Sequence, residues 1–248
     1  MGFLINPFIE FPDLSISVAD LKFYYTFGDD GDQLNTASDV GSTDAVSGST
    51  VSLYGNTTSG ETGHVSGIDA IGFPSYDTDG NYATSSNAAS DYDFLVKNAS
   101  TTVWTVCFWA SITEHGTYQT ADIWGTNGNG AGNDIQFRYL NNDRFTIWFA
   151  GNEYTGFTQT VTDTDYHFYV VSWDEPNGIA KFTIDNGTTQ TATGITTTNS
   201  SSPPAPLRFG DVTGNEFEGF LTLFMVFNRI LTADEMTILW NGGSGQAL

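Results

Sequence analysis

Residues 217–232 read FEGFLTLFMVFNRILT, and this stretch decides the fold class. Its middle part, from Phe220 to Phe227, is apolar at nearly every position and contains no proline. Continuous apolar runs of this length are typical of β-strands that are covered on both faces. The stretch therefore predicts a central strand in a layered β-protein.

A single helix is predicted directly after this strand. Thr232 and Glu235 have capping-box spacing, so the threonine can accept from the third helical amide while the glutamate reaches back. An apolar side follows at helical spacing, formed by Met236, Leu239 and Trp240. The pair Gly242-Gly243 is expected to stop the helix.

Upstream of residue 217 the chain reads as a series of hairpins. Residues 135–139 and 145–149 are apolar at every second position and are joined by Asn141-Asn142-Asp143. A second pair runs from residues 168–173 to residues 180–184, and Asp185-Asn186-Gly187 then supplies another tight turn. Two hairpins, each with one solvent-exposed and one buried face, favour a sandwich or a barrel.

The proline-rich segment 200–206 is predicted to cross the surface, because proline cannot donate to a central sheet. Residues 207–210 then restart the sheet. At 248 residues, with 39% hydrophobic and 15% aromatic residues, the chain has the material for one large core. All-β sandwiches of this length commonly form one domain.

The charge balance argues against two classes of partner. The chain has 29 acidic and 7 basic residues, which gives a formal net charge of −22. This charge would repel nucleic acid and anionic lipid surfaces. No apolar run approaches the roughly 18 residues of a membrane helix, so membrane insertion is not expected either.

Cys107 is the one cysteine of the chain, which excludes an intrachain disulfide. It lies in the apolar run 103–110, and we therefore expect a buried, inert thiol. The first twelve residues have no basic region and no small-residue cleavage site, so they do not resemble a signal peptide.

Five segments, in this order, carry a resemblance to a known family. They are residues 23–29, 73–82, 103–109, 166–174 with the turn 184–187, and 217–232 with the helix after it. Together they resemble the laminin-G-like domains of the concanavalin A-like lectin/glucanase superfamily, over roughly residues 20–243. The resemblance implies an all-β, two-sheet antiparallel jelly-roll sandwich with one short C-terminal helix.

At two positions the chain departs from the family pattern. Thr222 and Leu223 stand where the family usually carries two acidic residues. Any role of those acids is therefore lost here. The fold also hosts lectins, adhesion modules, glycan hydrolases and inert spacers, so the function has to be argued from individual residues.

No catalytic residues are predicted. Glucanases of this superfamily carry catalytic carboxylates at alternate positions of one strand, and the nearest pattern here, Glu216-Phe217-Glu218, lacks the third acid. His64, His115 and His167 are too scattered for a zinc motif, and His167 is expected to have a packing role. We therefore expect a protein that is not an enzyme.

A calcium site and a glycan site are candidates. Asp77, Asp79 and Asn81 offer three oxygen ligands in one loop, for which calcium is the functional alternative to a turn held by Asx hydrogen bonds. Sugar rings stack on exposed aromatic side chains, and three such side chains lie in stretches rich in Gly, Asn and Thr. They are Trp124, Tyr118 and Tyr154, for which core packing is the alternative.

Residues 1–19 are interpreted as an N-terminal apolar arm, and residues 20–248 as the laminin-G-like domain. Large apolar residues before the first family strand usually mark an interface. In this arm they are Phe3, Leu4, Ile5, Phe8, Ile9 and Phe11. Packing of the arm on its own domain is the alternative.

The resulting functional hypothesis is a phage virion protein on the surface of a capsid or tail. The arm would join other virion proteins and the jelly roll would bind host-surface glycans, and a homo-oligomer is left open. The short start Leu-Ile-Asn-Pro-Phe also resembles that of phage structural proteins with laminin-G-like domains. A secreted or cell-surface carbohydrate-binding adhesion module is the alternative, followed by a glycan hydrolase.

Overall fold

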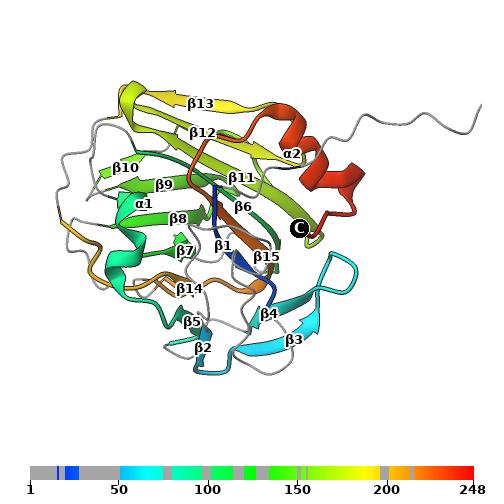
Figure 1. The fold of residues 1–248 in the computed structure, drawn as a ribbon. Coiled ribbons are helices and arrows are strands. Elements are labelled where there is room, and N and C mark those ends of the chain that lie inside the picture. Colours follow the sequence, from blue (N-terminus) through cyan, green and yellow to red (C-terminus); the bar gives the residue numbers. More distant parts are fainter. Residues whose placement is uncertain are drawn as a thin grey trace, which may run out of the picture.

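The protein is described here by a computed structural model. It describes residues 16, 20–27, 51–74, 80–96, 102–113, 120–126, 134–149, 152–154, 156–195, 201–212 and 215–248. Two antiparallel sheets lie face to face in this structure (Figure 1). The predicted all-β, two-sheet sandwich is therefore confirmed.

The larger sheet, called sheet A, has eight strands. Their order is β13 (Gln190–Thr193), β12 (Ile179–Ile184), β11 (Tyr166–Asp174), β6 (Val103–Ile112), β15 (Gly219–Phe227), β4 (Asp69–Phe73) and β3 (Thr58–Thr62), with β1 (Leu21–Tyr25) paired to β15. The second sheet, called sheet B, has seven. Their order is β10 (Asn152–Tyr154), β9 (Phe145–Phe149), β8 (Ile135–Leu140), β7 (Thr120–Gly125), β14 (Arg208–Gly210), β5 (Tyr82–Ser85) and β2 (Val51–Tyr54).

The helices of the described residues are short. They are α1 (Asp93–Val96), α2 (Ala233–Trp240) and the 3₁₀ turns η2 (Ala89–Tyr92), η3 (Glu175–Asn177) and η4 (Asn241–Gly243). The predicted capping box is confirmed, since Thr232 Oγ1 accepts from the Glu235 amide and Glu235 Oε2 accepts from the Thr232 amide. The helix ends at Trp240, directly before the predicted Gly242-Gly243 stop, and Asn241 takes the left-handed conformation of the C-cap.

The predicted hairpins are also confirmed. Strands β8 and β9 pair from Ile135↔Phe149 to Tyr139↔Phe145. Strands β11 and β12 pair from Tyr169↔Ile184 to Asp174↔Ile179. Asp185 and Asn186 both have positive φ at the turn after β12, as a two-residue tight turn requires.

Strand β15 is buried on both faces, as its sequence predicts. Its inward side chains, such as Leu221 and Phe224, join the core between the sheets. Met225 and Phe227 face the other way, into a second apolar cluster that includes Leu239 of α2. In Figure 1, α2 lies beside the β11 and β12 end of sheet A. The helix therefore covers part of the outer face of that sheet.

A β-bulge at Thr222 and Leu223 was not predicted. The pairing of β15 with β6 shifts its register between Thr222 and Met225, and Leu223 has a φ of 50°. Strand β15 pairs with β4 before this point and with β1 after it. Bulges bend a strand and increase its twist, and here the bend changes the neighbour of the central strand.

Candidate ligand-binding surfaces

Trp124 does not offer a ring face to a sugar. Its side chain is 0% exposed and packs between the sheets against Phe137, Trp104 and Phe224, with ring centroids 5.7–6.4 Å away. The glycan-binding prediction for Trp124 is therefore wrong. The bulge in β7 between Asp122 and Trp124 places the tryptophan on the inner face.

The other two predicted aromatic residues give less information. Tyr154 is half-buried on β10, and its ring meets the edge of Phe149 at a centroid distance of 6.3 Å. It packs against the core, so only part of the ring is accessible, and its glycan role stays a prediction. Tyr118 lies outside the described residues.

The predicted calcium loop is described only at Asn81, because Asp77 and Asp79 lie outside the described residues. The Asn81 side chain is buried, and Oδ1 accepts from the Asn56 amide at 2.8 Å while Nδ2 donates to the Pro74 carbonyl at 3.1 Å. Asn81 thus fastens two loops together. Calcium binding stays a prediction. The apolar arm residues Phe3, Leu4, Ile5, Phe8, Ile9 and Phe11 also lie outside the described residues.

Glu216 and Glu218, the two carboxylates that come nearest to the catalytic pattern of the glucanases, have different hydrogen-bond partners. Glu216 is buried and accepts from the Gly80 amide at 2.9 Å. Glu218 accepts from Thr113 Oγ1 at 3.4 Å and lines a hollow of about 380 Å³ with Glu61. Their side chains are thus engaged with separate segments of the chain.

Cys107 is fully buried, and burial raises the pKa of its thiol well above the usual value. This confirms the prediction of a buried thiol. His167 was expected to pack, and it instead forms ion pairs with two aspartates. Its ring nitrogens contact Asp185 and Asp163, and these contacts raise its pKa from 6.5 to about 9.

The outer face of sheet B carries a stack of three side chains that sequence analysis missed. The rings of Tyr54 and Tyr82 are 4.4 Å apart and nearly parallel, at an interplanar angle of 14°. The guanidinium carbon of Arg208 lies 3.9 Å from the centre of the Tyr82 ring. We call Tyr54, Tyr82 and Arg208 the aromatic stack.

Sheet topology determines which ring face of the aromatic stack is open. Strands β14 and β2 flank β5 on opposite sides, so Arg208 and Tyr54 cover opposite faces of the Tyr82 ring. Arg208 is also held by a hydrogen bond from Nη1 to the Val212 carbonyl at 3.4 Å. Tyr54 therefore ends the stack. The residue is 43% exposed, and it is the one exposed large hydrophobic residue among those described.

The same face of sheet B continues into a buried polar group. Arg138 Nε donates to Asp122 Oδ1 at 2.8 Å, and the guanidinium lies 4.6 Å from the centre of the Trp148 ring. Asp122 is 0% exposed, and Gln136 Nε2 donates to Asp134 at 2.7 Å beside it. Burial raises the pKa of Asp134. This group is largely desolvated, whereas Tyr54 of the aromatic stack is exposed.

One sequence signal marks Tyr54. It is the last residue of a strand and is followed by Gly55-Asn56, a turn pair at which side chains stay at the surface. Tyr82 and Arg208 lie 28 and 154 positions further along the chain. Only the pairing of β5 with both β2 and β14 brings the three side chains together.

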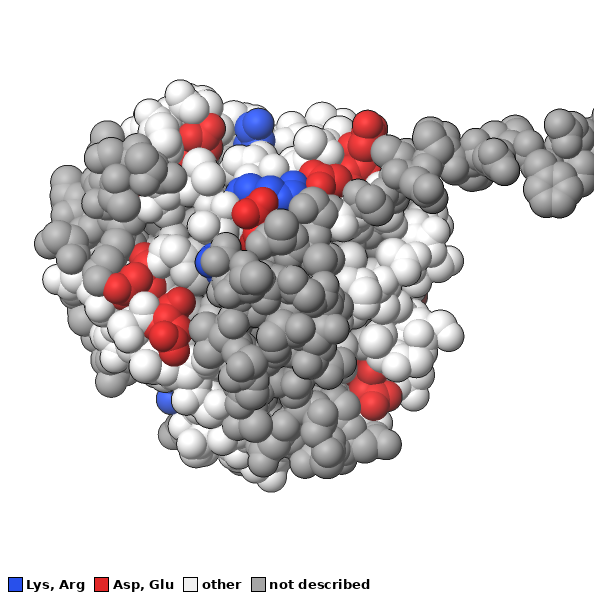
Figure 2. All heavy atoms as spheres, viewed as in Figure 1, with Lys and Arg blue, Asp and Glu red and all other residues white. Residues whose placement is uncertain are grey.

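A second concave site lies on the outer face of sheet A beside α2. It has a volume of about 340 Å³, at the lower end of the range of ligand pockets. We call it the α2 pocket. On the face shown in Figure 2, the acidic side chains of the described residues form separate small groups rather than one patch.

Comparison with known proteins places the chain in a family. The family model of the concanavalin A-like lectin/glucanases superfamily matches residues 77–237. The chain therefore belongs to this superfamily, and the predicted resemblance is confirmed over that range. A search of curated proteins found no matching sequence.

Solved structures with the same fold include two toxin domains and an enzyme. The binding domain of botulinum neurotoxin DC, in complex with rat synaptotagmin II, is similar with a TM-score of 0.63 at 11% identity, covering 90% of this chain and 52% of that one. The binding domain of botulinum neurotoxin serotype G gives 0.58 at 13%, covering 78% and 47%. A Trypanosoma rangeli sialidase gives 0.61 at 14%, covering 92% and 34%.

This chain thus spans about half or less of the length of these proteins. Identities this low establish the fold alone. The described helices include none that is long and apolar enough to cross a membrane.

Proposed function

We propose that this protein is a non-catalytic, lectin-like domain that binds surface glycans through the aromatic stack. The observation that carries the proposal is the exposed ring of Tyr54 at the end of the stack. A pyranose has an apolar C–H face that packs on an aromatic ring, while its hydroxyl groups stay in contact with water and polar side chains. Membership of a superfamily that includes lectins supports this class of function.

The stack is prepared for binding. Tyr82 supports the Tyr54 ring from below, and the Arg208 guanidinium supports Tyr82 in turn. Neither ring has to be ordered when a ligand arrives, which lowers the entropic cost of binding.

A glycan array with the purified full chain tests this proposal. We expect the wild-type protein to bind a subset of glycans, and Tyr54→Ala to weaken binding at least about tenfold. The matched control Tyr54→Phe keeps the ring and removes only the hydroxyl, so it should keep most of the affinity. Equal binding by wild type and Tyr54→Ala, or no glycan bound by the wild type, would refute the proposal.

Absence of catalysis belongs to the same proposal. The separate engagement of Glu216 and Glu218 supports it, because glycoside hydrolysis needs two carboxyl groups that flank one sugar bond. We expect no release of reducing ends from soluble glucans or agars. Release that Glu218→Gln abolishes would identify a hydrolase instead.

The biological setting we propose is a phage virion, in a capsid decoration or a tail. The support is the sequence of residues 1–19, whose apolar side chains suit contacts with other virion proteins. A secreted or cell-surface adhesion module is the alternative. Deletion of residues 1–19 tests the setting, because a truncated chain that joins particles as well as the full chain does would contradict anchoring by the arm.

A further inference from the structure

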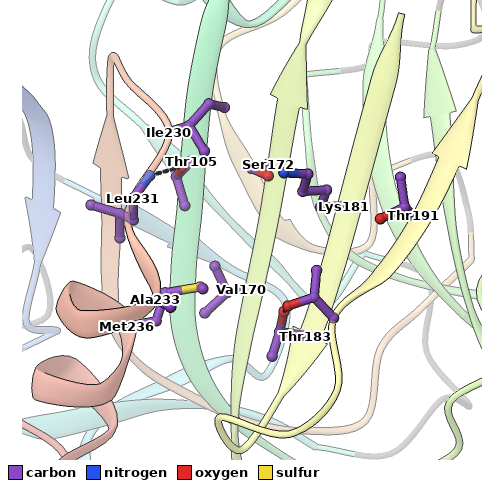
Figure 3. Close-up of a pocket in the computed structure, with 11 residues that line it drawn as sticks. Thr105, Val170, Ser172, Lys181, Thr183, Thr191, Ile230, Leu231, Ala233 and Met236 are labelled. Atoms are coloured by element: carbon purple, nitrogen blue, oxygen red, sulfur yellow. Dashed lines mark hydrogen bonds between the residues drawn. The ribbon is translucent and has the colours of Figure 1, made fainter.

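The α2 pocket is built on a row of polar residues that crosses four adjacent strands. Thr105 of β6 pairs with Ser172 of β11, Ser172 pairs with Lys181 of β12, and Lys181 pairs with Thr191 of β13. Directly paired residues point to the same face of a sheet. Figure 3 shows this row running across the strands beside α2. The row forms one polar side of the pocket.

The opposite side of the pocket is apolar. Met236 and Ala233 come from α2, Ile230 and Leu231 come from the segment before it, and Val170 rises from β11. In Figure 3 these side chains lie on the helix side of the row. A ligand in the pocket would therefore meet hydrocarbon on one side and polar groups on the other.

The hydroxyl groups of the pocket are not equally available. Thr105 Oγ1 donates to the Arg229 carbonyl at 2.8 Å and accepts from the Leu231 amide at 3.1 Å, so its hydroxyl is already used. The hydroxyl groups of Thr183 and Thr189 are hydrogen-bonded to each other at 2.8 Å. The hydroxyls of Ser172 and Thr191 make no side-chain hydrogen bond within the described part of the chain, and both line the pocket. Two hydroxyl groups are thus available to a ligand.

Among the described residues that line the pocket, Lys181 is the one with a charged side chain, and none of them is an aspartate or a glutamate. Its side chain is exposed, and no described Asp or Glu lies within ion-pair distance of it. This is unusual in a chain with 29 acidic and 7 basic residues. Lys181 is thus a cation with no counter-ion among the described residues. Because it lies between two available hydroxyls, it is complementary to one carboxylate.

We infer that the α2 pocket binds a small acidic sugar of the hexuronate kind. The carboxylate pairs with Lys181, the ring hydroxyls bond to Ser172 and Thr191, and the C–H face of the ring packs on Met236 and Val170. A volume of about 340 Å³ accommodates one such ring. This site lies on sheet A and is separate from the aromatic stack on sheet B, so it does not depend on the function proposed for that stack.

The test is a titration of the ¹⁵N-labelled full chain with D-glucuronate, followed by amide chemical shifts. D-glucose is the neutral control and acetate is the control for a bare carboxylate. We expect glucuronate to shift amides of β11, β12 and β13 with a dissociation constant of roughly millimolar or tighter, as suits a ligand of this size. Glucose and acetate should each bind at least about fivefold more weakly.

Two charge-matched variants complete the test. Lys181→Gln should weaken glucuronate binding at least about tenfold, since the charge-assisted pair is lost. Arg144→Gln removes one positive charge from an exposed hairpin of sheet B and should leave binding unchanged. Tyr54→Ala should also leave it unchanged, which separates this site from the aromatic stack.

Each other result overturns the inference. Absence of shifts in the pocket would show that no acidic sugar binds there. Equal binding of glucose would remove the role of the carboxylate, and equal binding of acetate would remove the role of the ring. Unchanged affinity in Lys181→Gln would show that Lys181 does not hold the ligand.

Discussion

The ion pairs of His167 predict a pH dependence of stability with a definite sign. His167 Nε2 lies 2.8 Å from Asp163 Oδ1, and Nδ1 contacts Asp185, whose other oxygen accepts from the Phe168 amide at 2.8 Å. When the ring is protonated, both nitrogens donate to a carboxylate. The hydrogen bond to Asp185 is the main cause that raises the pKa of His167 from 6.5 to about 9.

The magnitude follows from this shift. The folded-state pKa is higher than the unfolded-state value of about 6.5, so the protonated ring stabilises the fold. The stabilisation is complete below about pH 6.5 and is lost as the pH rises through about 9. The rise in the His167 pKa corresponds to roughly 3 kcal/mol in the free energy of unfolding. Because Asp163 is 57% exposed, solvent screening reduces the expected effect to about 2 kcal/mol.

Urea denaturation of wild type and His167→Gln at several pH values measures the effect. Glutamine keeps hydrogen-bonding capacity and does not titrate, so the difference between the two proteins isolates His167. We expect the wild type to be more stable by about 2 kcal/mol near pH 6 and the difference to vanish near pH 10. A difference that is the same at both pH values would refute this account of the ion pairs.

Three further experiments, two substitutions and one thiol-labelling measurement, have defined outcomes. Glu235→Ala removes two hydrogen bonds from Arg229, at 2.6 and 2.8 Å, and the capping hydrogen bond from the Thr232 amide. Urea denaturation should therefore show a loss of about 2–3 kcal/mol in the free energy of unfolding. Because the Glu235 pKa is lowered from 4.5 to about 2, the difference from wild type should disappear as the pH falls through this range. Trp124→Ala should cost about 3–5 kcal/mol by the same assay, since it empties a fully buried site, and a cost under about 1 kcal/mol would contradict its place in the core. The Cys107 thiol should react with a thiol reagent such as Ellman's only as fast as the protein unfolds, and prompt labelling of the native protein would contradict its burial.

Sequence patterns predicted the strands that have strong local signals. The run from Phe220 to Phe227 became β15, and the alternating pairs became the β8–β9 and β11–β12 hairpins. The capping box at Thr232 marked the start of α2 to the residue. These features depend on neighbouring residues and turn chemistry, which a sequence displays directly.

Candidate binding surfaces were predicted less well, for two physical reasons. The stretch around Trp124, rich in Gly, Asn and Thr, left glycan stacking and core packing both open for this residue, and a bulge in β7 turns its ring inward. The aromatic stack was missed because Tyr54, Tyr82 and Arg208 meet only through pairing between strands that are distant in sequence. Long-range pairing and bulges are set by tertiary packing, and single-sequence patterns do not report them.

The most direct test of the proposed function is an amide chemical-shift map of the ¹⁵N-labelled full chain with the glycan that the array binds best. If the aromatic stack holds the sugar, the largest shifts fall on β2, β5 and β14 around Tyr54, Tyr82 and Arg208, and they disappear in Tyr54→Ala. Shifts that leave these three strands unchanged and lie elsewhere on the domain would contradict the assignment of the glycan site.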